Sequence, residues 1–232
     1  LKQDKPDAYD KIRKDTVEYM IEQTLPCTKE EKNQPPAEWD IGFVLYHQFK
    51  DRFRCASLRN KTWYYFKHHR WVENENGNKL RFEISNTLSL LYTEKAEIYM
   101  NRSIELINAN AELSGKLKEK AGYLSSVALK LKSTQFKQNI MKEATEIFYE
   151  MDSKFINKLD KNQYLLCFTN GVYDFNEDEF RSGRPEDYIS LSTNIKYIPK
   201  KNSQKQKQLR SEIENFMYKL FPIDELRAYM WE

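Results

Sequence analysis

The sequence predicts an α+β fold that is mainly helical, with small antiparallel β-hairpins or meanders near residues 53–72 and 164–197. Apolar residues recur at helical spacing over several long stretches. The spacing changes to two in these two short regions, where turn-forming residues separate the candidate strands. Only 6 Gly and 7 Pro occur in 232 residues, and this composition favours a folded, helix-rich chain.

Two helices are predicted before the first strands. Apolar residues lie on one side of residues 7–24 and again of residues 37–49. Two adjacent prolines stop any earlier helix just before the second one begins. We therefore expect residues 1–36 to form an N-terminal helix and linker, and a middle domain to extend over residues 37–198.

The first β region is a predicted hairpin that continues into a meander. Residues 53–58 alternate in character, residues 59–61 form a tight turn, and a second strand follows near residues 62–67. Residues 70–72 extend the pairing, and the string NENGN marks the next turn because Asn and Gly tolerate positive φ. Aromatic side chains would fall on both faces of this sheet, so we expect both faces to be covered at least in part.

The longest apolar stripes follow this region. Ser85 is the predicted N-cap of a helix that runs to about Asn108, and a lysine-rich helical stretch comes next. Ser133 and Thr134 are predicted to begin the helix with the clearest repeat. Its apolar positions are Phe136, Ile140, Ala144, Ile147, Phe148, Met151 and Phe155.

The second β region begins in the stretch QYLLCFTNGVYDF, which starts at residue 163. Asn170 and Gly171 form a hairpin signal because Gly supplies a permissive backbone. Residues 179–181 and 190–197 are predicted as further strands. Residues 199–208 are predicted to form a solvated linker, and helices are predicted from there to residue 232.

Cysteine usage and hydropathy exclude several classes of protein. Cys27, Cys55 and Cys167 lie far apart and are odd in number, so we expect neither a disulfide framework nor a CxxC metal site. A reducing, intracellular compartment fits this usage. No run of about 18 apolar residues occurs and the first residues are polar, so we expect no membrane span and no signal peptide. Because the sequence lacks an initial Met and ends within a predicted helix, we interpret it as a piece of a longer protein.

Positive charge is concentrated in two segments although the net charge is only +3. Residues 50–82 contain nine Lys and Arg against three acids, and residues 116–142 contain seven Lys against one Glu. In the first segment, the cations are interleaved with aromatic rings, as in surfaces that bind single-stranded nucleic acid. The predicted DNA-binding candidates are Arg52, Arg54, Arg59, Lys61, Tyr64, Lys67, Arg70, Trp71, Lys116, Lys118, Lys120, Lys130 and Lys132.

A structural interpretation stands beside each of these candidates. The aromatic rings can instead form the core of a small sheet, with a basic rim and an exposed ring at Tyr64 or Trp71. The lysines of residues 116–142 can instead form a solvated helical surface. Charge contacts to phosphate need little geometric precision, so the sequence alone does not orient these side chains.

Two longer stretches together resemble a known family. They are WYYFKHHRWVENENGNKLRFEIS at residues 63–85 and FINKLDKNQYLLCFTNGVYDFNEDEFRSGRPEDYIS at residues 155–190. Both are similar to segments of the helicase-primases of poxviruses and other nucleocytoplasmic large DNA viruses, and the second lies just before the superfamily 3 helicase core in those proteins. The matching residues to which we assign a structural role are Asn170, Gly171, Tyr173, Asp174, Arg181, Pro185, Asp187 and Tyr188.

The resemblance implies a non-catalytic domain between a primase and a hexameric, ATP-driven helicase. No GxxxxGK[ST] phosphate loop occurs in this sequence, so we expect ATP and Mg²⁺ to bind a helicase domain after residue 232, with no cofactor or metal held here. The parent protein would be an ATP-dependent DNA helicase with primase activity, acting at the viral replication site in the host cytoplasm or nucleus. This domain would assist ring assembly and engage single-stranded or forked DNA.

Two alternatives remain from the residues themselves. One is an oligomerisation collar that does not touch DNA. The other is a metal-dependent nuclease built on the carboxylates around the second β region, which more plausibly serve as turn and cap residues. Those carboxylates are Asp174, Glu177, Asp178, Glu179, Glu186 and Asp187. A metal site at His47, His68 and His69 is not expected, since adjacent strand residues point to opposite faces.

Overall fold

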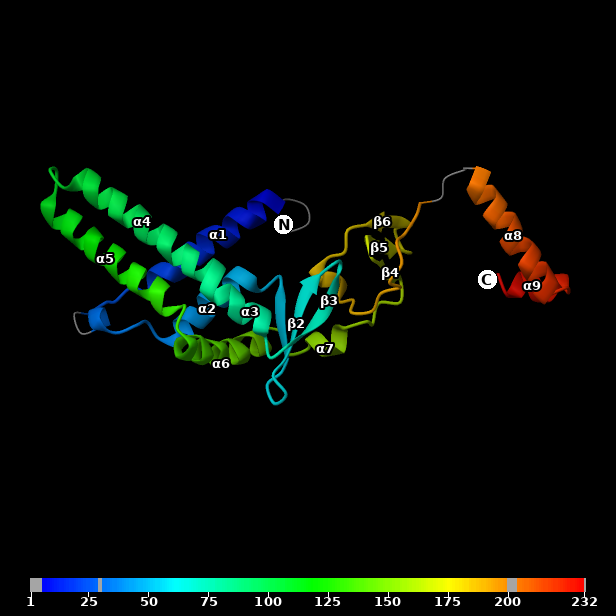
Figure 1. The fold of residues 1–232 in the computed structure, drawn as a ribbon, viewed down its shortest axis with the longest axis horizontal. Helices are drawn as coiled ribbons and strands as arrows, with labels where there is room; N and C mark the ends of the chain where they lie inside the picture. The colour runs from blue at the N-terminus through cyan, green and yellow to red at the C-terminus, as the bar shows by residue number, and fades with distance from the viewer. Residues whose placement is uncertain (1–5, 29–30, 200–203, 232) are drawn as a thin grey trace. The chain divides into compact units, whose positions relative to one another are not determined.

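Helices and two three-stranded antiparallel sheets make up the described part of the chain, residues 6–28, 31–199 and 204–231, in a computed structural model (Figure 1). This confirms the mainly helical α+β class. The chain divides into two compact units between Asn194 and Ile195. The first unit contains α1 (Pro6–Gln23), α2 (Glu38–Phe49), β1 (Phe53–Ser57), β2 (Thr62–Lys67), β3 (Arg70–Glu75), α3 (Asn78–Glu83), α4 (Ser89–Leu106), α5 (Ala111–Lys130), α6 (Thr134–Met151), α7 (Phe155–Lys158), β4 (Leu165–Phe168), β5 (Gly171–Asp174) and β6 (Glu179–Arg181).

The main core of the first unit lies where α1, α2 and α6 meet the first sheet, α3, the start of α4 and the end of α5. The stripe predicted on α6 is buried from Phe136 to Phe148, whereas Met151 at its end is 51% exposed, which corrects its assignment to the core. At Gly42, a Cβ atom would lie 2.7 Å from the Cδ1 atom of Ile147. The end of the Ile147 side chain of α6 therefore packs directly against the backbone of α2 at this glycine.

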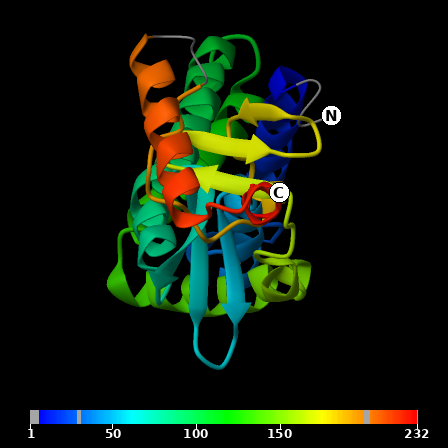
Figure 2. The same cartoon turned by 90° about the vertical axis from the view of Figure 1, so that its right-hand side faces the viewer.

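The first sheet has the order β1-β2-β3, with the predicted hairpin and meander (Figure 2). Phe53 pairs with Tyr65 and Cys55 with Trp63, so these side chains share one face of the sheet, which covers the main core. Tyr64 and the residues that alternate with it form the other face. The hairpin turn between β2 and β3 consists of His68 and His69, both with positive φ, as a two-residue turn of this twist requires.

The helix after the first sheet begins earlier than Ser85. It starts with α3 at Asn78, passes through a π-helical turn at Ile84–Leu88 and continues as α4. Ser85 lies inside this helix and its hydroxyl donates to the Leu131 carbonyl at 3.3 Å, so the predicted N-cap is wrong. A π turn inserts an extra residue, which rotates α3 relative to α4 by about 100°.

Helices α4 and α5 form a long antiparallel hairpin (Figure 1). Small side chains allow close approach near its end, where Ser103 and Ser114 donate to each other's backbone carbonyls at 2.8 and 2.7 Å. Asn110 caps α5 by accepting from the backbone N–H of Leu113 at 3.0 Å. The predicted lysine-rich helical stretch is thus α5.

The second sheet has the order β4-β5-β6, so the predicted hairpin at residues 163–175 and the strand at 179–181 are confirmed. Thr169 and Asn170 form the turn, and Gly171 begins β5 opposite Phe168. A Cβ on Gly171 would lie 2.6 Å from the Arg181 carbonyl oxygen, so this glycine provides space for β6. Residues 190–197 form no strand, which corrects that prediction. They are held by side-chain and isolated backbone bonds, such as Thr193 N–H to the Cys167 carbonyl at 2.9 Å.

The second unit contains α8 (Gln204–Leu220) and α9 (Asp224–Tyr229). The predicted linker at residues 199–208 lies partly outside the described residues, and its last part is the first turn of α8. Arg227 donates to the Phe221 carbonyl at 3.0 Å and closes the turn between the two helices. Within the described ranges, no helix has the length and hydropathy that crossing a bilayer requires.

Candidate nucleic-acid interface

The tryptophans of the first aromatic stretch are buried. Trp63 and Trp71 are each 1% exposed, on opposite faces of the first sheet. The Trp63 ring packs edge-on against Phe148 of α6 at 5.2 Å, and the Trp71 ring packs against Phe155 of α7 at 5.2 Å. The expectation of an exposed ring is therefore wrong for Trp71.

The His-Arg-Trp triplet at residues 69–71 binds the segment at residues 183–190. The Gly183 N–H donates to Nδ1 of His69 at 3.1 Å, and Arg70 donates to the Ser190 carbonyl at 2.9 Å. Trp71 donates twice, from its indole to the Pro185 carbonyl at 2.8 Å and from its backbone to the Ile189 carbonyl at 2.7 Å. The two stretches that carry the family resemblance thus contact each other, and Arg70 has a structural role in this contact.

Two further predicted candidates are also engaged internally. Arg54 pairs with Asp152 at 3.1 Å, and its guanidinium lies over the Trp71 ring at 5.2 Å. Tyr64 is half-buried against Phe155 at 5.4 Å, and this burial, more than the nearby carboxylates, raises the pKa of its hydroxyl. Both side chains therefore make contacts within the first unit.

The family-motif residues of the second sheet form a local network. Arg181 donates to both carboxylate oxygens of Asp187, at 2.9 and 2.8 Å, and to Asp174 at 3.2 Å. Asp187 also accepts from the Arg184 N–H at 2.7 Å. The Tyr188 ring packs against Phe155 in a tilted arrangement, with 6.0 Å between the ring centres. Asp174 and Asp187 therefore hold the β5–β6 region through Arg181, as turn and cap residues.

Histidine, cysteine and carboxylate side chains do not gather into a metal-binding group of three or more within residues 6–28, 31–199 and 204–231. His69 uses its Nδ1 atom to bind the Gly183 backbone. His47 lies on α2, whereas His68 and His69 form the turn between β2 and β3.

The remaining predicted cations are exposed. Arg52 pairs with Glu83 at 3.2 Å, Lys116 with Glu112 at 2.6 Å, and Lys120 lies over the Tyr99 ring at 5.5 Å. The other exposed cations of the set are Arg59, Lys61, Lys67, Lys118, Lys130 and Lys132.

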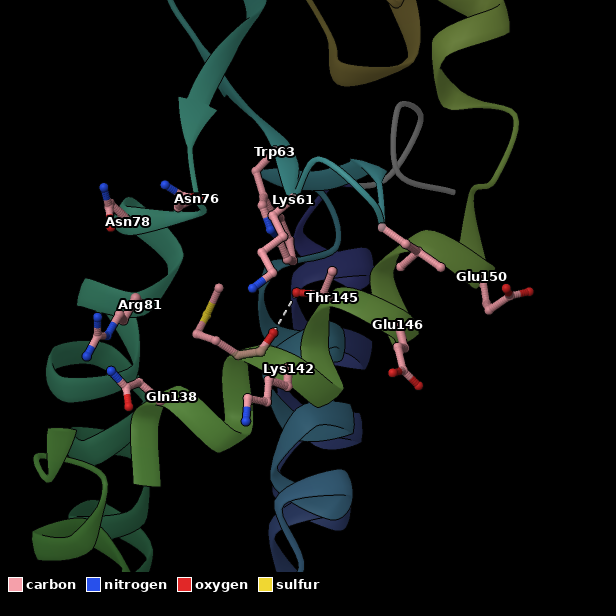
Figure 3. A pocket seen from close by; sticks show the side chains of 12 residues that line it. Lys61, Trp63, Asn76, Asn78, Arg81, Gln138, Lys142, Thr145, Glu146 and Glu150 are labelled. Atoms are coloured by element: carbon pink, nitrogen blue, oxygen red, sulfur yellow. Dashed lines mark hydrogen bonds between the residues drawn. The ribbon is translucent and has the colours of Figure 1, made fainter. Parts of the chain in front are cut away.

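Lys61 lines an open cleft of about 580 Å³, which we call the basic cleft. The cleft is formed by the β1–β2 turn, the start of α3 and one face of α6 (Figure 3). Its other polar lining residues include two further cations and three amides. These are Arg81, Lys142, Asn76, Asn78 and Gln138.

The charges of the basic cleft are unevenly distributed. Among the residues that the structure describes, no carboxylate lies within 4.0 Å of the charged groups of Lys61, Arg81 or Lys142. Glu146 and Glu150 also line the cleft, but they lie at the end opposite Arg81 (Figure 3). Three cations from three elements thus line one concave surface, and none of them forms an ion pair with the two carboxylates of the cleft.

The sequence pointed to only part of this cleft. Lys61 was among the predicted DNA-binding residues, whereas Arg81 and the three amides were not. On α6, Gln138, Met141, Lys142 and Thr145 recur at spacings of three, one and three, which places them on one helix face opposite the buried stripe. That polar face was the available signal for Lys142 and Gln138.

The chain is similar to proteins of large DNA viruses. It is 31% identical over 227 residues to "Putative helicase L207/L206" of Acanthamoeba polyphaga mimivirus, a match that spans 98% of this chain and 22% of that protein. "Putative helicase 121R" of Invertebrate iridescent virus 3 is 37% identical over 43% of this chain and 10% of its own length. "Putative helicase 022R" of Frog virus 3 is 23% identical over 67% of this chain and 18% of its own length. The chain spans about a fifth or less of the length of these relatives.

The family model described as "D5 N terminal like" matches residues 43–222. This match extends over both stretches that carry the predicted resemblance and over more than half of the chain. The resemblance to the helicase proteins of large DNA viruses is confirmed. The chain belongs to the D5 N terminal like family.

Proposed function

We propose that this chain is a non-catalytic, DNA-binding part of a viral helicase-primase, and that its basic cleft holds the phosphates of DNA. The observation that carries the proposal is that Lys61, Arg81 and Lys142 line one cleft and that none has a carboxylate partner among the described residues. The similarity to viral proteins with helicase names supports a role in DNA replication.

The chemistry of the cleft fits a phosphate backbone better than a small neutral ligand. A guanidinium offers a planar set of donors that matches phosphate oxygens, and a lysine offers a mobile point charge. Asn76, Asn78 and Gln138 add amides that donate to phosphate or sugar oxygens. The three cations outnumber the two carboxylates that line the cleft, and such an excess of positive charge raises the local concentration of a polyanion.

The catalytic steps of the parent protein are proposed to lie elsewhere. ATP and Mg²⁺ would bind a helicase domain that follows this one, because no phosphate loop occurs in the 232 residues. We expect the purified chain to show neither ATP turnover nor Mg²⁺-dependent cleavage of DNA. Cleavage that Asp187→Ala abolished would instead support the nuclease alternative.

Fluorescence anisotropy with labelled DNA tests the cleft directly. We expect the wild-type chain to bind, and the triple variant Lys61→Ala, Arg81→Ala, Lys142→Ala to bind at least tenfold more weakly at low salt.

A matched control keeps the same change in net charge. It is the triple variant Lys11→Ala, Lys14→Ala, Lys161→Ala, whose residues are exposed and lie outside the predicted DNA-binding set, and it is expected to lose much less affinity. Equal losses in the two triple variants would show diffuse attraction and overturn the cleft. Absence of wild-type binding would remove the DNA-binding function.

Ring assembly is a second candidate function, favoured by the far half of the α4–α5 hairpin. Ile98, Ile104 and Ile107 are 54–61% exposed there, and Met100 and Leu113 are exposed as well. Such a set of exposed apolar side chains is typical of a contact with another protein. We propose a neighbouring copy as that partner. Sedimentation of the full-length protein should show smaller assemblies for Ile104→Glu than for Glu105→Gln on the same turn.

A further inference from the structure

A second hollow lies beside the basic cleft, and we call it the aromatic cleft. Its volume is about 530 Å³, and it is lined by three cations and by aromatic rings. The residues that matter here are Arg52, Tyr65, Phe66, Lys67, Lys79 and Phe82. Asn78, at the start of α3, lines both this cleft and the basic cleft.

Phe82 is the most unusual residue of the aromatic cleft because its side chain is 68% exposed. It is followed by Glu83 and then by the π turn, which rotates α3 relative to the buried stripe of α4. The fold gains little from a phenylalanine at this position, since most of its ring stays in water. A ring in this state is available to stack on a ligand.

The cations of the aromatic cleft lie beside its rings. The ammonium of Lys79 is 4.6 Å from the centre of the Tyr65 ring, and the Arg52 guanidinium is 5.7 Å from that of Phe53. Glu83 is the one carboxylate among the described residues that line the cleft, and it pairs with Arg52 at 3.2 Å. Lys67 has no carboxylate within 4.0 Å among the described residues. Rings and positive charge together fit a ligand that has both flat bases and phosphates.

Two elements connect the clefts. On β2, Trp63 lines the basic cleft and Tyr65 the aromatic cleft, on the same face of the strand and about 7 Å apart. On α3, the neighbours Arg81 and Phe82 line the basic and the aromatic cleft, respectively. A chain that crosses α3 at Asn78 therefore meets a phosphate-binding surface and then a stacking surface.

We propose that the two clefts form one track for single-stranded nucleic acid, with phosphates in the basic cleft and an unpaired base stacked on Phe82. This inference rests on the proposed function of the basic cleft and adds the form of the ligand. A duplex holds its bases in its own stack and offers no free base face to Phe82, whereas every unpaired base does.

The test compares Phe82→Ala with the wild-type chain on a labelled oligothymidylate and on a duplex. Stacking contributes about 1–3 kcal/mol per base, and 1.4 kcal/mol is tenfold in affinity, so we expect about 5- to 150-fold weaker binding of the single strand. Binding of the duplex should change by less than about twofold. Phe82→Trp should retain single-strand affinity, because indole also stacks.

Phe175→Ala is the matched control. Phe175 is 56% exposed and precedes β6, on the second sheet, so its loss should leave single-strand binding unchanged. The thermal midpoint of Phe82→Ala should equal that of the wild type, since the ring is mostly solvated.

The outcomes separate the two proposals. If Phe82→Ala and Phe175→Ala both bind the single strand like the wild type, the track is wrong while the basic cleft stands on its own variants. Equal weakening of single-strand and duplex binding by Phe82→Ala also contradicts stacking. Failure of the wild type to bind any DNA overturns both proposals.

Discussion

Replacing Trp71 by phenylalanine tests whether the aromatic stretch is a structural joint. The indole donates to the Pro185 carbonyl at 2.8 Å and packs on Phe155, so it connects the first sheet to the segment that follows the second. Phenylalanine keeps an aromatic ring against Phe155 and under Arg54 but removes the N–H donor.

The expected loss is about 2 kcal/mol of unfolding free energy. Leaving the half-buried Pro185 carbonyl unpaired costs about 1 kcal/mol. The smaller ring buries roughly 50 Å² less, within the spread of aromatic side chains, which at about 25 cal/mol/Å² costs about 1 kcal/mol more. For a chain of this size, the sum corresponds to a fall of about 4–8 °C in thermal midpoint.

Urea unfolding followed by far-UV circular dichroism measures this loss. Trp39→Phe is the control, because Trp39 is 46% exposed and should change the free energy by about 0.5 kcal/mol or less. DNA affinity of Trp71→Phe should stay within about twofold of the wild type under conditions where both are folded. An unfolding curve of Trp71→Phe that matches the wild type, or a loss of DNA binding without a loss of stability, would refute the structural assignment.

Three further predictions follow from close contacts and burial. Gly183→Ala should destabilise the chain by about 1–3 kcal/mol in thermal melts, because its Cβ atom would lie 2.5 Å from the backbone of the β2–β3 turn. Gly122→Ala on α5 is the control: its Cβ atom would meet nothing within 4 Å, so it should be neutral or stabilising. Iodoacetamide should label the exposed Cys27 in the native chain and spare Cys55, whose thiol pKa is raised by burial to about 11; rapid native labelling of Cys55, read by mass spectrometry, would contradict this. Burial, and then the charge of Lys50, lowers the pKa of His47 below its ordinary 6.5. The neutral imidazole therefore stabilises the fold above pH 6.5, and this contribution is lost as the pH falls through the lowered pKa. His47→Gln should make the thermal midpoint depend less on pH between about pH 7 and pH 5, and an unchanged dependence would count against this assignment.

Much of the fold could be predicted because local pattern and tertiary burial agree. The stripe from Phe136 to Phe148 and the alternation in β1 and β2 each match a buried face. The start of the long helix could not be predicted in this way. Its first turns carry an exposed Phe82, and a π turn breaks the period, so Ser85 became the apparent cap.

The candidate site was predictable only in part because it depends on how separate elements meet. Charge density marked residues 50–82 correctly as basic, yet it could not distinguish Lys61, which lines a cleft, from Arg70, which binds a backbone carbonyl. Arg81 could not be predicted as a cleft residue, because the local sequence does not distinguish a cation that lines a cleft with a helix distant in sequence from any other surface cation. The family resemblance, by contrast, depended on residues that contact each other across the first unit, such as Trp71 and Pro185.

The salt dependence of single-strand binding tests the central claim most directly, because it counts phosphate contacts. The claim is that the basic cleft neutralises phosphates with Lys61, Arg81 and Lys142. Each contact to a single strand contributes about 0.7 to the slope of log affinity against log salt. The triple alanine variant should therefore show a slope shallower by about 2 than the wild type, and an unchanged slope would contradict the account.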